Sequence, residues 1–157
     1  TAAGPRHMVF HPFRPYAYAI NELDSTVTGY RWDSAHGILQ PFQILPTTPA
    51  TFTGNNSGSG IAVDRSGRYI FASNRGHESV ATFSIDVETG MLAPLYWRLT
   101  EGKKPRFFVL DPTGTWLYVA NQDSDNIVTF RVEEGGELSF AGHSVKTGTP
   151  SCIAFAA

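Results

Sequence analysis

Charged and titratable side chains gather at two recurring positions of this 157-residue sequence. Arg6 and His7 lie where one predicted strand begins, and Glu22, Arg75 and His77 lie just past the ends of two others. Guanidinium groups bind phosphate or carboxylate through two parallel hydrogen bonds, and Glu and His side chains transfer protons. Brought together, these residues would form a binding site. The alternative is that they are ion pairs and asparagine caps at the ends of loops.

The elements that would position these side chains come from an internal repeat. Residues 11–21, 64–74 and 111–121 align without a gap, at successive offsets of 53 and 47 residues. The match continues through 27–30, 80–83 and 127–130, and then through a Gly-x-Leu at 37–39, 90–92 and 136–138. A period in the high forties with several short strands per repeat is typical of a β-propeller. We therefore predict an all-β fold of four-stranded antiparallel blades.

The third repeat shows the strand pattern most clearly. We expect strands at about 106–110, 115–121 and 126–132 and a fourth from about residue 138, with a type I turn favoured by the Asp, Pro and Gly of 111–114. The predicted blades are 4–57, 58–103 and 104–148, and 149–157 is a closing strand that lies innermost in a further blade. Propellers close with typically four to eight blades. Three blades and one strand therefore predict part of a larger ring.

The first two strands of each blade run antiparallel, so the start of the first and the end of the second lie at the same end of the blade. Residues at these positions from all blades should meet at one mouth of the central channel. The asparagine that ends the second strand is identical in all three repeats, at positions 21, 74 and 121, whereas the residues next to it differ and are often charged. Variation on a constant frame is typical of a binding site on a repeat scaffold.

Composition narrows the possible partners. The formal net charge of −2 argues against nucleic acid, whose phosphates need a basic stripe. No apolar run approaches the ~18 residues of a membrane helix, and no basic and apolar signal segment is present, so we expect no membrane contact and a cytoplasmic location. Lys103 and Lys104 are expected in a solvated blade connection. We expect Cys152, the one cysteine, to be a buried inert thiol.

Several familiar catalytic patterns are absent from the sequence, namely a Gly-x-Ser-x-Gly elbow, a His-Glu-x-x-His motif and a Walker phosphate loop. The glycine-rich stretch 54–60 has no Lys-Ser/Thr, and we interpret it as a flexible linker. His7 and His11 would lie roughly 13 Å apart on a strand and cannot share one ion. His11 also occupies the turn position of Asp64 and Asp111. We therefore expect no metal.

Three blades alone would leave sheet edges and blade faces open to solvent. We expect aromatic side chains such as Trp32, Phe83 and Phe130 on these open faces. Exposed apolar patches drive association. The missing propeller blades, a second chain or a copy of this chain should therefore cover them.

Four stretches of the sequence resemble the lactonase family of seven-bladed β-propellers, which includes cycloisomerase-type 6-phosphogluconolactonases and carboxy-muconate lactonising enzymes. They are Gly-Pro-Arg-His at 4–7, Asn-Glu at 21–22, Asn-Arg-Gly-His at 74–77 and Pro-Arg-Phe-Phe at 105–108, in the family's order. The ending Pro-Ser-Cys-Ile-Ala-Phe at 150–155 is similar to the family's C-terminus. The resemblance spans the whole chain and identifies it as a C-terminal half.

The resemblance implies hydrolysis of a sugar lactone, most similar to 6-phosphogluconolactone, at a cofactor-independent site in the channel mouth. It assigns Glu22, His7 and Arg6 to catalysis, and Arg75, His77 and again Arg6 to binding of a small anionic lactone. The family's further histidine would lie in an earlier blade, so we expect the isolated fragment to be inactive. A lactonising cycloisomerase of the carboxy-muconate type and a non-catalytic propeller scaffold are the alternatives.

Overall fold

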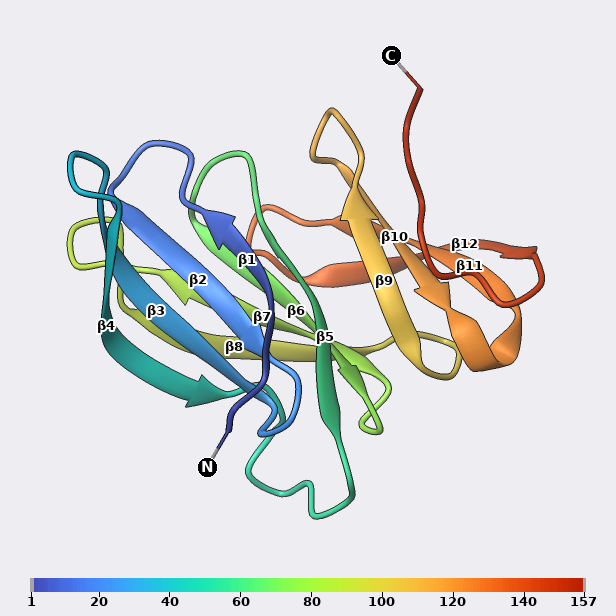
Figure 1. The fold of residues 1–157 in the computed structure, drawn as a ribbon. Helices are drawn as coiled ribbons and strands as arrows, with labels where there is room; N and C mark the ends of the chain where they lie inside the picture. The colour runs from blue at the N-terminus through green and yellow to red at the C-terminus, as the bar shows by residue number, and fades with distance from the viewer. Residues whose placement is uncertain (1, 157) are drawn as a thin grey trace.

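The computed structural model describes residues 2–156, which form three four-stranded antiparallel sheets (Figure 1). Each sheet is one blade, and its strands follow one another in chain order. Blade 1 contains β1 (Pro5–Phe10), β2 (Tyr16–Asn21), β3 (Thr26–Asp33) and β4 (Ile38–Pro46). Blade 2 contains β5 (Ser57–Val63), β6 (Tyr69–Arg75), β7 (Ser79–Ile85) and β8 (Leu92–Leu99). Blade 3 contains β9 (Pro105–Leu110), β10 (Trp116–Asn121), β11 (Asn126–Val132) and β12 (Leu138–Lys146). The all-β propeller prediction is confirmed, and a single 3₁₀ turn, η1 (Gln122–Ser124), is the helical structure of the described residues.

The turn between the first two strands of each blade is held by the side chain that the repeat predicted. Asp64 Oδ1 accepts the backbone N–H groups of residues 68 and 69, and Asp111 Oδ1 accepts that of residue 116. His11 Nδ1 accepts two backbone N–H groups in the same place. Its proton therefore lies on Nε2, which donates to the carbonyl of Gly67 in the next blade, 2.9 Å away. His11 is thus a turn residue.

The hydrophobic core lies between blades. Tyr18 and Ile20 of blade 1 pack with Phe83 of blade 2 in one buried cluster, and Phe71 of blade 2 packs with Phe130 of blade 3 in another. Phe83 is 0% exposed and Phe130 is 1% exposed, so the expectation that they lie on open faces is wrong. The alternation of a strand gives two faces but does not say which one meets the neighbouring blade. Of the three aromatics expected there, Trp32 alone remains half-buried.

A second contact repeats at both blade junctions. Tyr16 and Tyr69, equivalent residues at the start of β2 and β6, each donate a hydroxyl hydrogen bond to a backbone carbonyl of the next blade, at 2.6 and 3.1 Å. Their rings lie against Gly90 and Gly136, where a Cβ atom would come within 2.7 and 2.6 Å of ring carbons. Both glycines have a positive φ, 77° and 79°. The Gly of the repeated Gly-x-Leu therefore makes the turn and accepts the aromatic ring.

The glycine-rich stretch 54–60 is not a linker throughout, because β5 begins inside it. Gly58 and Gly60 are buried in this strand. A Cβ atom on Gly58 would lie 2.6 Å from the backbone oxygen of Asn21, and one on Gly60 would lie 3.0 Å from the ring of Phe108. The flexible-linker interpretation is therefore wrong for the second half of the stretch. These glycines allow β5 to approach the end of β2 in blade 1 and β9 in blade 3 closely.

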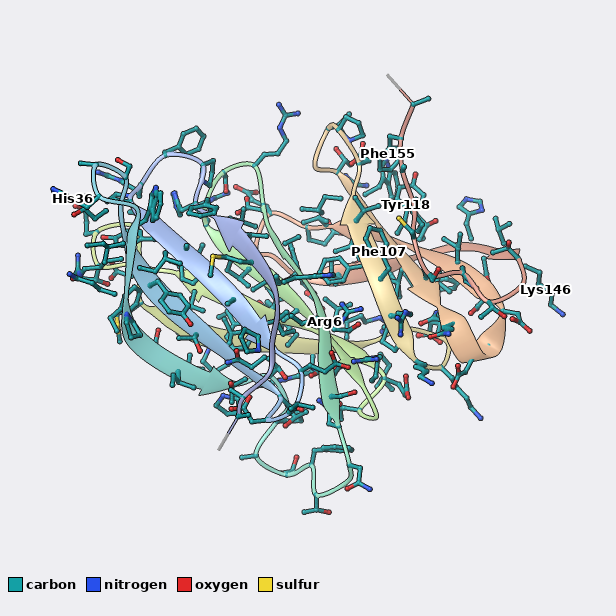
Figure 2. The ribbon with its side chains drawn as sticks, in the orientation of Figure 1. Arg6, His36, Phe107, Tyr118, Lys146 and Phe155 are labelled. Atoms are coloured by element: carbon teal, nitrogen blue, oxygen red, sulfur yellow. The ribbon has the colours of Figure 1, made fainter. Side chains whose placement is uncertain are left out.

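The C-terminal segment 151–156 is assigned no strand. A strand needs a hydrogen-bonded neighbour, and the described chain places none beside it. The Phe155 ring packs edge-on against Tyr118 of blade 3, with centroids 5.6 Å apart (Figure 2). Cys152 is exposed, so the expectation of a buried thiol is wrong for this chain. An inner strand of a further blade stays a prediction for the complete ring.

Candidate functional site

Two arginines are presented by the same irregularity in an inner strand. The residues on either side of Arg6 in β1 pair with adjacent residues of β2, so Arg6 is the extra residue of a β-bulge. Arg106 has the same position in β9 relative to β10. A bulge redirects its side chain out of the regular alternation, and bulges are frequent beside active sites. Figure 2 shows Arg6 near the middle of the molecule, among the inner strands β1, β5 and β9.

Glu22 brings the two neighbouring blades together electrostatically. It follows the last residue of β2, and Arg75 is the last residue of β6. Arg75 Nη2 donates to Glu22 Oε1 at 2.6 Å, and Arg6 Nε lies 3.5 Å from Glu22 Oε2. We call these three residues the Arg–Glu–Arg cluster. The sequence predicted that they would share one end of the propeller, and the structure brings them together.

Backbone carbonyls of β5 orient both arginines of the cluster. Arg6 Nη1 donates to the carbonyl of Ser59 at 2.7 Å, and Arg75 Nη2 donates to that of Gly58 at 3.1 Å. Among the described residues, Arg75 Nε is buried without a hydrogen-bond partner. The exposed fractions of the side chains are 9% for Arg75, 17% for Arg6 and 37% for Glu22. The guanidinium groups are therefore fixed and partly desolvated, while the carboxylate remains open to water.

The cluster holds Glu22 in its charged form. The hydrogen bond from Arg75 is the main cause that lowers the pKa of Glu22 below its ordinary value of 4.5, with further lowering by the charges of Arg75, Arg6 and Arg106 and some opposition from burial. Glu22 is therefore a carboxylate at neutral pH. Burial, then the neighbouring positive charge of Arg75, lowers the pKa of Arg6. Arginine remains protonated at neutral pH despite such shifts.

His7 lies beside the cluster. It lines a shallow hollow together with Pro5, Arg6, Met8 and Ala19. Arg6 Nη1 is 3.4 Å from His7 Nδ1, at the outer limit of a hydrogen bond. Burial, followed by the charge of Arg6, lowers the pKa of His7 below its ordinary value of 6.5. The imidazole is therefore neutral at neutral pH and able to accept a proton.

His77 is held by the connection between blades 1 and 2. Its ring packs edge-on against Phe52 at a centroid distance of 4.9 Å, and its backbone N–H donates to Asn56 Oδ1. His77 Nδ1 lies 2.7 Å from Ser79 Oγ. Burial lowers its pKa. The observed contacts fix His77 to the loop, and its role in substrate binding stays a prediction.

The sequence reasoning missed the residues that hold the strand ends in place. Asn74, the residue before Arg75, is fully buried, and its side chain bonds to Thr47 Oγ1 at 2.6 Å, to the Thr47 carbonyl at 2.8 Å and to Asn56 Nδ2 at 3.0 Å. This network links the end of β6 to the chain between the blades. The identical asparagine of the repeat was a signal for a buried network, but its partners lie in segments of irregular length.

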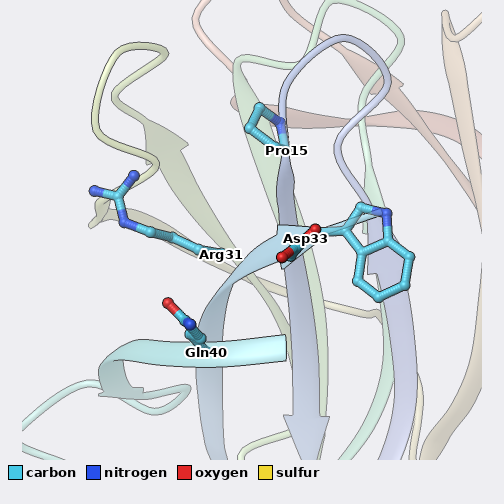
Figure 3. A pocket seen from close by; sticks show the side chains of 5 residues that line it. Pro15, Arg31, Asp33 and Gln40 are labelled. Carbon is cyan, nitrogen blue, oxygen red and sulfur yellow. The ribbon is translucent and has the colours of Figure 1, made fainter. Parts of the chain in front are cut away.

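A second hollow lies on the outer part of blade 1, between β3 and β4. Pro15, Arg31, Trp32, Asp33 and Gln40 line it (Figure 3). Arg31 stacks over the rings of Tyr16 and Phe42, and Asp33 is bonded to His36. Its charged groups are thus engaged in local contacts, and none belongs to the Arg–Glu–Arg cluster.

The structure contains no group of three or more His, Cys, Asp or Glu residues able to hold a metal ion, within the part of the chain that it describes. No helix among residues 2–156 is long and apolar enough to cross a membrane.

Three blades with an arginine–carboxylate cluster at their inner ends define a partial β-propeller with a candidate anion site. Residues 1–155 match the family model described as "Lactonase, 7-bladed beta-propeller". The chain therefore belongs to this lactonase family, as its sequence motifs predicted.

Similar proteins and solved structures support the same family assignment. A Bacillus subtilis protein named 6-phosphogluconolactonase is 38% identical over 154 residues, which are 98% of this chain and 44% of the relative. The Pseudomonas aeruginosa periplasmic gluconolactonase PpgL has a TM-score of 0.92 at 32% identity, over 99% of this chain and 43% of that chain. A putative 6-phosphogluconolactonase from Bacteroides fragilis has a TM-score of 0.90 at 31% identity, over 99% of this chain and 43% of that chain. The chain thus spans less than half the length of these relatives.

Proposed function

We propose that the complete protein hydrolyses an anionic sugar lactone of the 6-phosphogluconolactone type at the Arg–Glu–Arg cluster. The observation that carries this proposal is the position of Glu22, a carboxylate open to water and fixed between two arginines of neighbouring blades. The family and the names of the relatives support the same substrate class. The remaining blades of the relatives' ring would supply the rest of the channel mouth.

The chemistry follows from the ionisation of these groups. Glu22 accepts a proton from water as the water oxygen bonds to the lactone carbonyl carbon, and His7, neutral beside it, is the second candidate base. The carbonyl oxygen becomes an oxyanion, which a guanidinium stabilises electrostatically. The ring C–O bond then breaks, and the departing oxygen takes up a proton to give the hydroxy acid. Sugar lactones are reactive, so modest catalysis suffices.

Binding of the substrate falls to the arginines. Arg75 is nearly buried, and a guanidinium in such surroundings forms strong hydrogen bonds to carboxylate or phosphate. His77 remains a proposed contact from the side of the loop that joins blades 1 and 2. No step requires a cofactor.

The lowered pKa of Glu22 favours hydrolysis over lactone formation. A lactonising cycloisomerase must deliver a proton to a carbon atom, which needs a general acid that is protonated at working pH. Glu22 is ionised there and is suited to accept a proton. In a scaffold without turnover, Glu22 would serve only as the ion-pair partner of Arg6 and Arg75.

The test is Glu22→Gln in the complete protein, assayed against 6-phosphogluconolactone above the spontaneous rate. Loss of a general base costs typically 10²–10⁴-fold in rate, so we expect kcat to fall by about that factor while KM changes little. Asp24→Asn is a matched control. Asp24 is exposed and lies two residues after Glu22, so this substitution removes the same negative charge outside the cluster. Undiminished turnover in Glu22→Gln, with chemistry limiting the rate, would exclude Glu22 as the base, whereas no turnover by the unchanged protein would favour the scaffold.

A cytoplasmic location is part of the same proposal. Cell fractionation tests it directly. Recovery of the protein in a periplasmic fraction, as the name of the Pseudomonas aeruginosa relative states for that protein, would contradict it.

A further inference from the structure

The charges around the cluster do not balance. Arg6 and Arg75 share one carboxylate, that of Glu22. Arg106 is a third arginine whose charge acts on the same groups, since it lowers the pKa of both Glu22 and Arg6. Within the described residues Arg106 forms no ion pair, whereas its neighbour Lys104 lies 3.4 Å from Asp123 Oδ2. Three guanidinium groups against one carboxylate leave a surplus of positive charge.

The backbone presents Arg106 in the same way as Arg6. Both are the extra residue of a bulge at the start of an inner strand, and both are half-buried. The carbonyl of Arg106 accepts a 2.7 Å hydrogen bond from Ser59 Oγ, which fixes the bulge against β5. The carbonyl of the same Ser59 accepts the hydrogen bond from Arg6. One residue of blade 2 therefore connects both arginine-bearing bulges.

A structural role is the competing explanation. In the repeat, Ser59 occupies the position of Arg6 in the next blade, and Ser151 occupies the position of Arg106 in the blade after that. By analogy with the bond from Arg6 to the Ser59 carbonyl, Arg106 in a complete ring would donate to the carbonyl of Ser151. Such a bond would use one of the five N–H donors of the guanidinium. The remaining donors would stay free for an anion, just as Arg6 contacts Glu22 in addition to the carbonyl of Ser59.

We propose that Arg106 binds the charged group of an anionic lactone and thereby sets the preference for phosphorylated over neutral lactones. This inference rests on the function proposed above. Arg6 and Arg75 each use some of their donors on Glu22 and on backbone carbonyls, whereas no such contact engages the Arg106 side chain within the described residues. Its whole planar fork is therefore available for two parallel bonds to a phosphate, beside the donors that Arg6 and Arg75 still offer. A neutral lactone lacks the group that Arg106 recognises.

The experiment compares Arg106→Gln with the unchanged complete protein on two substrates, 6-phosphogluconolactone and glucono-δ-lactone. We expect KM for the phosphorylated lactone to rise at least about tenfold, with kcat retained and both constants for the neutral lactone unchanged. Arg106→Lys keeps the charge but loses the fork, so it should restore part of the affinity. Lys103→Ala, which removes an exposed charge three residues away, should change neither substrate.

Two results would overturn the inference. Equal losses on both lactones together with a lower melting temperature would assign Arg106 to a structural link, and unchanged constants on both would remove it from the site.

Calorimetry with inorganic phosphate separates this inference from the proposed function. If the unchanged protein hydrolyses neither lactone, the proposed function fails, but phosphate binding that weakens at least about tenfold in Arg106→Gln still supports the role of Arg106. Equal phosphate affinity in both proteins, or no binding by either, overturns it.

Discussion

The two blade junctions have the same framework but different chemistry at their inner ends. At the junction of blades 1 and 2, Glu22 is held by arginines from both blades. At the junction of blades 2 and 3, Arg75 occupies the position of Glu22 and Gln122 occupies that of Arg75, so no carboxylate is present there; the side-chain oxygen of Gln122 is buried without a partner in the described chain. The buried asparagines and the ring-on-glycine contacts recur at both. The framework therefore fixes where side chains lie, and a few rim residues decide what they do.

The largest expected effect is on lactone affinity, when Arg75 is removed from the Arg–Glu–Arg cluster. Arg75→Ala in the complete protein should weaken binding of an anionic lactone by about 2–5 kcal/mol, the range for truncating a desolvated charge partner. Arg75 is only 9% exposed, so water would compensate poorly. Inhibition by the hydroxy-acid product measures this affinity without turnover. Arg65→Ala is the control, because Arg65 is a surface arginine that bonds to the Pro112 carbonyl. An equal loss of affinity in Arg65→Ala would show that Arg75 does not bind the lactone specifically.

A smaller effect should follow from pushing β5 away from the end of β2, next to the cluster. Gly58→Ala places a Cβ atom 2.6 Å from the backbone oxygen of Asn21, which cannot move as a side-chain end could. We expect destabilisation of about 1–3 kcal/mol, as for other overpacked sites, measured by denaturant unfolding. Gly148→Ala adds the same methyl group where no atom lies within 4 Å. Similar unfolding curves for the two variants would show that the close approach is not required.

The sequence predicted the framework of the fold better than its packing. The repeat predicted the blades, the strand ends and the meeting of Arg6, Glu22 and Arg75, because an antiparallel blade brings fixed positions to one end. It began the second blade at residue 58, but we interpreted 54–60 as a flexible linker, because Gly and Ser carry no periodic hydrophobic signal that would mark a strand. Nor did the repeat reveal that Phe83 is buried, because a blade face becomes core only through its neighbour.

The pH dependence of turnover tests the charged junction directly. The folded pKa of Glu22 is lowered, so the carboxylate stays ionised until the pH falls below its ordinary value of 4.5. The acidic limb of kcat/KM should therefore lie below pH 4.5 if Glu22 is the base. Arg75→Met removes the hydrogen bond that mainly lowers this pKa, so the limb should move to higher pH. A limb that stays in place in Arg75→Met would assign the titration to another group.

The smallest effect should distinguish the junctions by a single hydrogen bond. Tyr16 donates at 2.6 Å from a nearly buried position at the first junction, whereas Tyr69 donates at 3.1 Å from a more exposed one at the second. Loss of one such bond costs about 0.5–1.5 kcal/mol, more when the abandoned carbonyl is shielded from water. Because the aromatic ring and its contact with glycine remain in both variants, unfolding free energies of Tyr16→Phe and Tyr69→Phe isolate the hydroxyl. We expect Tyr16→Phe to lose more than Tyr69→Phe. The opposite order would mean that the shorter bond is not the stronger one, and that the junction bearing the Arg–Glu–Arg cluster is held chiefly by its charges and its packed rings.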